Sequence, residues 1–150
     1  MNGKTDINAF FSGKTFALAG ISRSGQSMSN AVFRELAARG FRILPVNPNA
    51  ASIGGATCYP SLAALPEKPD GVIVFTPKAQ TAQIVREASD CGIRRVWIQQ
   101  GAQTPEAIAL CGEKKLEAVW GRCILMFAEP VGSMHAFHRT IARIFGRLPK

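Results

Sequence analysis

Short apolar runs alternate with longer amphipathic segments along the whole chain. Runs that are rich in β-branched and aromatic residues predict strands. The chain has five of them: Thr15–Ala19, Phe41–Val46, Gly71–Phe75, Arg95–Ile98 and Leu116–Trp120. Most are continuously apolar rather than alternating, as expected where helices cover both faces of a sheet. The pattern therefore predicts an α/β fold with a doubly wound, parallel, five-stranded sheet.

The segments between these runs carry helix start and stop signals. A serine or threonine can cap the first turn, proline suits the first helical position, and glycine commonly follows the last turn. These signals predict four helices: from Ser27 or Ser29 to Gly40, from Thr76–Pro77 to Gly92, from Thr104–Pro105 to Gly112, and from about 133 to 146. We expect residues 1–150 to form a single domain with its core at about 14–123.

One connection is longer than the others. Residues Asn47–Tyr59 form an irregular, glycine-containing stretch between the second strand and a short turn at Ser61–Leu65. Long loops in compact domains often bind ligands. This loop is therefore a second place, besides the loops directly after the strands, where we expect ligand contacts.

The composition fits a globular protein. Apolar residues make up 47% of the 150 residues, and no apolar run approaches the roughly 20 residues that cross a bilayer. The segment Met1–Lys14 lacks the apolar stretch and cleavage site of a secretion signal. These observations predict no membrane span and a cytoplasmic location.

An excess of basic residues favours anionic ligands. The net charge is +8, which suits phosphates or nucleic acid. Arg139, Arg143, Arg147 and Lys150 form a basic stripe on the last predicted helix, for which a solvated helix face is the simpler interpretation. The stripe lacks interleaved aromatic residues and a known motif, so the charge alone does not favour nucleic-acid binding.

The metal-binding residue types are scattered. The four cysteines are Cys58, Cys91, Cys111 and Cys123. His135 and His138 lie three residues apart without a third ligand nearby, so we expect no metal site. Cys123 is the one candidate for chemistry, because the charge of Arg122 would favour its thiolate and hence disulfide exchange. An unreactive buried thiol is the simpler interpretation.

The loop after the first strand carries a nucleotide-binding signal. In open parallel sheets, ligands bind outside the carboxyl ends of the strands. Gly20-Ile21-Ser22-Arg23-Ser24-Gly25, followed by Gln26, lies between a strand and a helix and is a G-x-S-x-x-G variant of the dinucleotide fingerprint. Backbone N–H groups and the helix dipole can bind a pyrophosphate there. We therefore expect a Rossmann-like fold whose ligand-binding site includes this loop.

The end of the second strand argues against a nicotinamide cofactor. An NAD site usually has an acidic residue at this position to hold the ribose hydroxyls. Here Val46 is followed by Asn47-Pro48-Asn49, and no carboxylate occurs between Glu35 and Glu67. No basic residue directly follows Val46 to bind the 2′-phosphate of NADP either. An NAD(P)-binding oxidoreductase or redox sensor therefore remains only the alternative.

Several short motifs in fixed order resemble the CoA-binding domain family, small stand-alone proteins similar to the N-terminal domain of the succinyl-CoA synthetase α subunit. The motifs are Gly20-Ile21-Ser22, Gly40 to Pro48, Gly55 to Leu62, Asp70 to Pro77, Val96 to Gln99 with Gly101, and Arg122-Cys123. The resemblance extends from about Lys14 to about Cys123. Members often carry a lysine soon after the Val-Asn-Pro segment, and this chain has none at that point.

The resemblance implies coenzyme A, free or acylated, as the ligand. It places the pyrophosphate near Ser22 to Gln26, the adenosine end near Asn47 and Pro48, and the pantetheine arm past Phe75, Thr76 and Pro77. Gln99 and Gly101 would line the far side. Each position also has a purely structural interpretation: Pro48 can stiffen a loop, Thr76 can cap a helix, and Gln99 can bond the backbone.

A binding module is favoured over an enzyme. Neither a nucleophile with its base nor an acid and base in different environments can be assembled from these residues. The expected partner is therefore a small-molecule nucleotide ligand, with no membrane contact. The oligomeric state stays open between a monomer and a weak homodimer, since the apolar residues of the last predicted helix could pack on the sheet or on a second copy.

Overall fold

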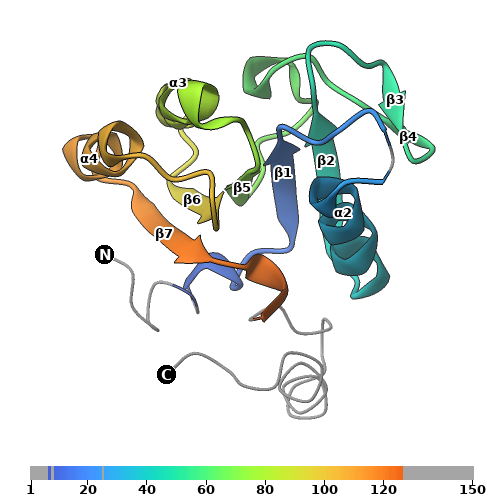
Figure 1. Cartoon of the computed structure of the whole chain (residues 1–150), viewed down its shortest axis with the longest axis horizontal. Coiled ribbons are helices and arrows are strands. Elements are labelled where there is room, and N and C mark those ends of the chain that lie inside the picture. The colour runs from blue at the N-terminus through green and yellow to red at the C-terminus, as the bar shows by residue number, and fades with distance from the viewer. Residues whose placement is uncertain (1–6, 8, 25, 127–150) are drawn as a thin grey trace.

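The predicted strands form one parallel sheet in the computed structural model, which describes residues 7, 9–24 and 26–126 (Figure 1). Its strands are β1 (Thr15–Ala19), β2 (Arg42–Val46), β5 (Gly71–Val74), β6 (Arg95–Gln99) and β7 (Glu117–Arg122). Their order is β2-β1-β5-β6-β7, and every neighbouring pair is parallel. The predicted α/β, Rossmann-like fold is therefore confirmed.

Strand bounds differ from the predicted ones by one or two residues. Phe41 and Leu116 precede their strands rather than beginning them, and Phe75 follows β5. All three carry apolar side chains that pack against the cores beside the sheet. An apolar side chain next to a strand end thus extends the sequence pattern beyond the hydrogen-bonded strand.

Three helices begin and end close to the predicted signals: α2 (Met28–Ala38), α3 (Lys78–Asp90) and α4 (Pro105–Glu113). Ser27 is the N-cap residue of α2, and the Thr104 hydroxyl caps α4 by accepting from the Ala107 N–H at 3.0 Å. Gly40 and Gly92, the predicted ends of the first two helices, have φ values of 95° and 78°. Glycine adopts this left-handed conformation without steric cost.

Two predicted helix ends are wrong. Pro77, not Thr76, is the N-cap residue of α3, and the Thr76 hydroxyl bonds another side chain instead of capping the helix. Gly112 does not end α4, which continues to Glu113, and Lys115 adopts the positive φ of 58° beyond it. The Arg94 guanidinium donates to the Lys115 carbonyl at 2.6 Å and so helps to hold that unusual conformation.

The helices cover both faces of the sheet (Figure 1). On one face, α2 packs through Val32 and Leu36 on the side chains of β1 that include Phe16 and Leu18. On the other face, α3 and α4 pack on the alternate β1 residues and on β5 to β7, with Val85 at 0% exposure. The chain leaves β1 toward β2 on one side and returns to β5 on the other, so the topological switch point lies between β1 and β5.

The long connection after β2 contains a small hairpin that the sequence pattern did not predict. Strands β3 (Ser52–Ile53) and β4 (Ala56–Thr57) pair antiparallel, and the 3₁₀ turn η1 (Leu62–Ala64) follows them. Ile53 is buried in the core on the α2 face. The hairpin is thus packed onto the domain beside α2.

The amino edge of the sheet is held by charged side chains. The Asp70 carboxylate accepts from the N–H groups of Lys14 and Thr15 at 2.8 and 3.1 Å. These bonds lower the pKa of Asp70 despite an opposing effect of burial. Arg95 donates to the Ser12 hydroxyl at 2.9 Å and pairs with Glu117 at 3.5 Å. The segment before β1 is therefore bonded to the starts of β5 and β6.

Some of the predicted features fall on residues outside the described ranges. The helix predicted at about 133 to 146, with His135, His138 and the basic stripe, lies outside the described residues, as does Gly25. The extent of the single domain over residues 1–150 stays a prediction. Among the described residues, no helix combines the length and the apolar character that a membrane span requires.

Candidate functional site

The carboxyl edge of the sheet brings together the loops predicted to bind ligand. Because all five strands are parallel, the loops after β1, β2, β5 and β6 emerge at the same edge. Gly20, with a φ of 88°, lies at the point of closest approach: a Cβ atom there would lie 2.6 Å from the Thr76 nitrogen and 2.7 Å from the Phe75 carbonyl carbon. Only glycine allows the β1–α2 and β5–α3 loops to approach this closely.

Two serine hydroxyls bond backbone amides on the solvent side of the β1–α2 loop. The Ser24 N–H donates to the Ser22 hydroxyl and the Gln26 N–H donates to the Ser24 hydroxyl, both at 3.1 Å. The two hydroxyls are 3.0 Å apart. Two loop amides are thus bonded to rotatable hydroxyl oxygens, and a phosphate oxygen that took the place of these hydroxyls would receive the same N–H groups.

Buried polar side chains hold the same loop from the protein side. Asn30, only 1% exposed, donates to the Ser22 carbonyl at 2.9 Å and accepts from the Ser27 N–H at 3.2 Å. Ser29, 4% exposed, accepts from the Ser22 N–H at 3.0 Å. The first turn of α2 therefore fixes the backbone of the loop at both ends. The sequence pattern did not predict the role of Asn30. A polar residue beside the buried stripe of Ser29, Val32 and Leu36 was the one signal for it.

Asn47 ties the end of β2 to the same loop. Its side-chain amide donates to the Ile21 carbonyl at 2.8 Å, and its side-chain oxygen accepts from the Asn49 N–H at 2.7 Å. Ile21 itself is completely buried. Asn47 therefore positions the loop in this structure, while the neighbouring Pro48 is exposed.

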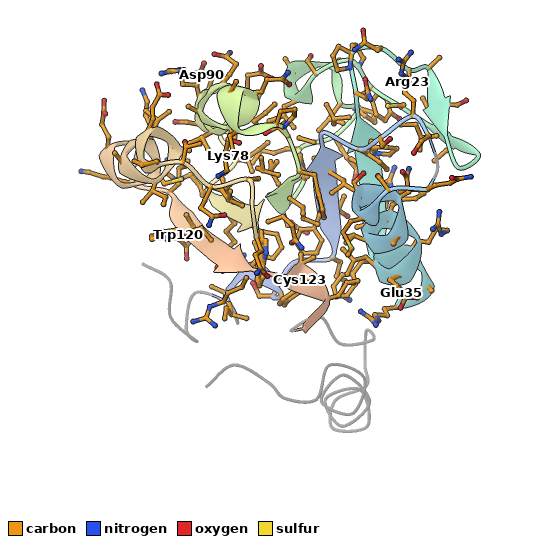
Figure 2. All side chains as sticks on the ribbon, viewed as in Figure 1. Arg23, Glu35, Lys78, Asp90, Trp120 and Cys123 are labelled. Carbon is orange, nitrogen blue, oxygen red and sulfur yellow. The ribbon has the colours of Figure 1, made fainter. Side chains whose placement is uncertain are left out.

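Two basic side chains are exposed at this edge. Figure 2 shows Arg23 in the loop after β1 and Lys78 at the start of α3. The first turns of α2 and α3 contain no acidic residue. Both helix N-termini also carry the positive end of a helix dipole. The local electrostatics therefore favour an anion between these two loops.

The loops after β5 and β6 each combine a buried polar side chain with exposed residues. Thr76 is 5% exposed and its hydroxyl lies 3.0 Å from that of Thr81. Gln99 is 4% exposed, and its side-chain oxygen accepts from the Ile124 N–H at 3.1 Å. Phe75 is half-buried, whereas Pro77 and Gly101 are exposed. Gln99 thus bonds the backbone in this structure, which is the purely structural role that the sequence also allowed for it.

The described residues include all four cysteines. All four are free thiols, and burial raises the pKa of Cys58 and raises that of Cys111 to about 11. Cys123 is half-buried directly after β7. No group of three or more histidine, cysteine, aspartate or glutamate residues in the described part of the chain could hold a metal ion.

Known proteins share both the sequence and the fold. A family model described as a CoA binding domain matches residues 14–129. The chain is 32% identical over 130 residues to the ADP-forming acetate–CoA ligase II of Archaeoglobus fulgidus, a match that covers 85% of this chain but only 18% of the ligase. It thus spans 18% of that relative's length.

Two solved structures of hypothetical proteins have the same fold. The protein from Pyrococcus furiosus is 33% identical with a TM-score of 0.71, and the match covers 74% of this chain and 96% of that one. The protein from Pyrococcus horikoshii is 31% identical with a TM-score of 0.76, and the match covers 81% and 87% of the two chains. The match therefore covers most of each solved chain.

Proposed function

Because the chain belongs to the CoA binding domain family, we propose that it binds coenzyme A at the carboxyl edge of its sheet, with the pyrophosphate on the β1–α2 loop and the first turn of α2. Family membership supports CoA binding in general. The placement of the ligand is our proposal, and it rests on the close approach of Gly20 to Thr76, which puts the phosphate loop beside the β5–α3 loop.

The pyrophosphate would receive backbone N–H groups. The first three N–H groups of α2 have no acceptor within the helix, as at any helix N-terminus. Among the described residues, the amides of Ser24 and Gln26 are bonded to serine hydroxyls, which can rotate away or add a donor of their own. Arg23 adds a positive charge. This combination stabilises a doubly charged group without a metal ion.

The remaining parts of the ligand follow the neighbouring loops. The adenosine end would lie near Asn47 and Pro48, and the pantetheine arm would pass Phe75, Thr76 and Pro77. Gln99 and Gly101 would lie on the far side of the arm, with Gln99 acting through the backbone it holds. No lysine follows Pro48 closely, so we expect the 3′-phosphate of CoA to add little affinity.

Calorimetric titration with CoA, dephospho-CoA, NAD and NADP tests this proposal. We expect CoA to bind, dephospho-CoA to bind within about fivefold of it, and both nicotinamide cofactors to bind at least about tenfold more weakly, because β2 ends without an acid for the ribose hydroxyls. Tighter binding of NAD or NADP than of CoA would instead favour the oxidoreductase or redox-sensor alternative.

A further inference from the structure

A chain of buried hydroxyl groups joins the β5–α3 loop to the β6–α4 loop. Thr81, in the first turn of α3, is completely buried. Its hydroxyl donates to the Ala102 carbonyl at 2.7 Å and lies 3.0 Å from the Thr76 hydroxyl. A longer contact of 3.4 Å leads to the Pro77 carbonyl. One side chain thus contacts both loops that flank the proposed path of the pantetheine arm.

The direction of these hydrogen bonds follows from counting protons. A hydroxyl has one proton, and a carbonyl oxygen can only accept. The short bond to the Ala102 carbonyl uses the proton of Thr81, so the Thr76 hydroxyl must donate to Thr81. The Thr76 oxygen is then left with acceptor capacity alone. Any ligand group that bonds this oxygen must itself be a donor.

The two loops are also fixed at their other ends. The Ala102 N–H donates to the Gln99 carbonyl at 2.9 Å, and the Thr76 nitrogen lies 2.6 Å from the position that a Cβ of Gly20 would occupy. The tight packing against Gly20 therefore restrains the Thr76 backbone, and loss of the Thr81 hydroxyl would change the Thr76 side chain and the Ala102 loop rather than the phosphate loop. A buried hydroxyl that couples Thr76 to Ala102 can set the geometry of the site without touching the ligand.

We infer that Thr81 is a positioning residue for the pantetheine arm. It holds the loops of β5 and β6 together and directs the proton of Thr76 away from the ligand, so that Thr76 accepts a hydrogen bond from an N–H or O–H group. The amide groups of pantetheine are donors of this kind, whereas a phosphate is an acceptor. This inference rests on the proposed function, because it requires the arm to lie along the β5–α3 loop.

Substitutions of Thr81 test the binding of the pantetheine arm separately from the binding of the nucleotide. Thr81→Val removes the hydroxyl and keeps the branched shape, and Thr81→Ser keeps the hydroxyl. Each variant is titrated with CoA and with adenosine 3′-phosphate 5′-diphosphate, which has the 3′-phosphate and the two phosphates of the 5′-diphosphate but lacks the pantetheine arm. We expect Thr81→Val to weaken CoA binding by about five- to tenfold and to leave the nucleotide unchanged, while Thr81→Ser restores CoA affinity to within about twofold of wild type.

A merely structural role would give a different result. Equal weakening of both ligands by Thr81→Val, unchanged CoA affinity, or a failure of Thr81→Ser to restore it would overturn the inference. Thr76→Val removes the other hydroxyl of the chain and is expected to give the same selective loss, so the test does not depend on the folding of one variant. If the wild-type protein does not bind CoA, the proposed function itself is overturned.

Discussion

The two edges of the sheet use polar side chains for different purposes. At the amino edge, the Asp70 carboxylate binds two backbone N–H groups, and Arg95 joins Ser12 to Glu117. At the carboxyl edge, neutral hydroxyl and amide groups hold the loops, and the hydroxyls of half-buried Ser22 and exposed Ser24 bond amides that a ligand could use. Charged side chains hold the amino edge together, whereas neutral groups hold the loops of the carboxyl edge, where a ligand would supply the negative charge.

This difference indicates where stability and binding reside. At the amino edge, the carboxylate stays bonded to the backbone N–H groups, because no ligand is expected to replace it there. At the carboxyl edge, a ligand can replace the neutral hydroxyl as the acceptor of the backbone N–H group. The hydroxyl also does not repel an incoming phosphate. We therefore expect substitutions at the amino edge to change stability without changing CoA affinity, and most substitutions at the carboxyl edge to do the reverse.

The largest expected effect comes from Gly20→Val, where the carboxyl edge should lose both stability and binding. The new side chain would have to adopt a φ of 88° and would overlap the backbone of Thr76. We expect destabilisation by about 3 kcal/mol or more in urea unfolding, together with loss of CoA binding. Gly101→Ala is the control, because its φ is 95° but a Cβ there meets nothing within 4 Å. It should cost only about 1 kcal/mol.

A carboxylate in the phosphate loop should affect binding alone. Ser22→Asp and Arg23→Glu place negative charge beside the proposed pyrophosphate, so calorimetry should show CoA affinity reduced at least about tenfold with the melting temperature nearly unchanged. Lys68→Glu makes the same charge change as Arg23→Glu near the start of β5, at the opposite edge, and should leave affinity within about twofold. Equal effects of Arg23→Glu and Lys68→Glu would show that only net charge matters.

Asn47→Asp tests the link between β2 and the phosphate loop. Aspartate cannot donate to the Ile21 carbonyl, so one of the bonds that position the loop is lost. We expect CoA affinity to fall by about five- to tenfold. The same change introduces the acid that NAD sites carry after the second strand, so titration with NAD serves as the comparison. A gain of NAD affinity without a loss of CoA affinity would contradict the role assigned to Asn47.

Asp70→Asn should have the smallest effect and should act on stability alone. The pKa of Asp70 is lowered in the folded state, so its contribution is present above the ordinary carboxyl pKa of about 4 and is lost as the pH falls through the lower folded value. The carboxylate is exposed, and we expect a loss of at most about 1 kcal/mol at pH 7. Urea unfolding at pH 7 and pH 3 should show the difference between variant and wild type narrowing at acid pH, with CoA affinity unchanged at pH 7.

Much of the fold was predictable because apolar runs and glycine stops report directly on burial and turns. The strand β1 was predicted with its observed bounds, and Gly40 and Gly92 follow the helices as expected. The hairpin of β3 and β4 was missed, because two-residue strands are too short to show an alternating pattern. Lys115 replaced Gly112 at the end of α4, since a bond from Arg94 supports the positive φ of a non-glycine residue.

The candidate site was predictable in its loops but not in its supporting contacts. The position of Gly20 between a strand and a helix identified the loop. Asn30 and Thr81 were missed because sequence position does not reveal which buried backbone groups need a partner. Thr81 did carry a signal, since it lies four residues before Val85 on the buried face of α3. A polar residue in an apolar helical stripe marks a buried hydrogen bond.

A crystal structure of the complex with CoA tests the central claim most directly. We predict that the two bridging phosphates lie within hydrogen-bond distance of the N–H groups of Ser24, Gln26 and the first turn of α2, with the Ser22 and Ser24 hydroxyls turned away or bonded to the phosphates. A complex in which these hydroxyls still occupy the amides while the pyrophosphate binds elsewhere would contradict the account.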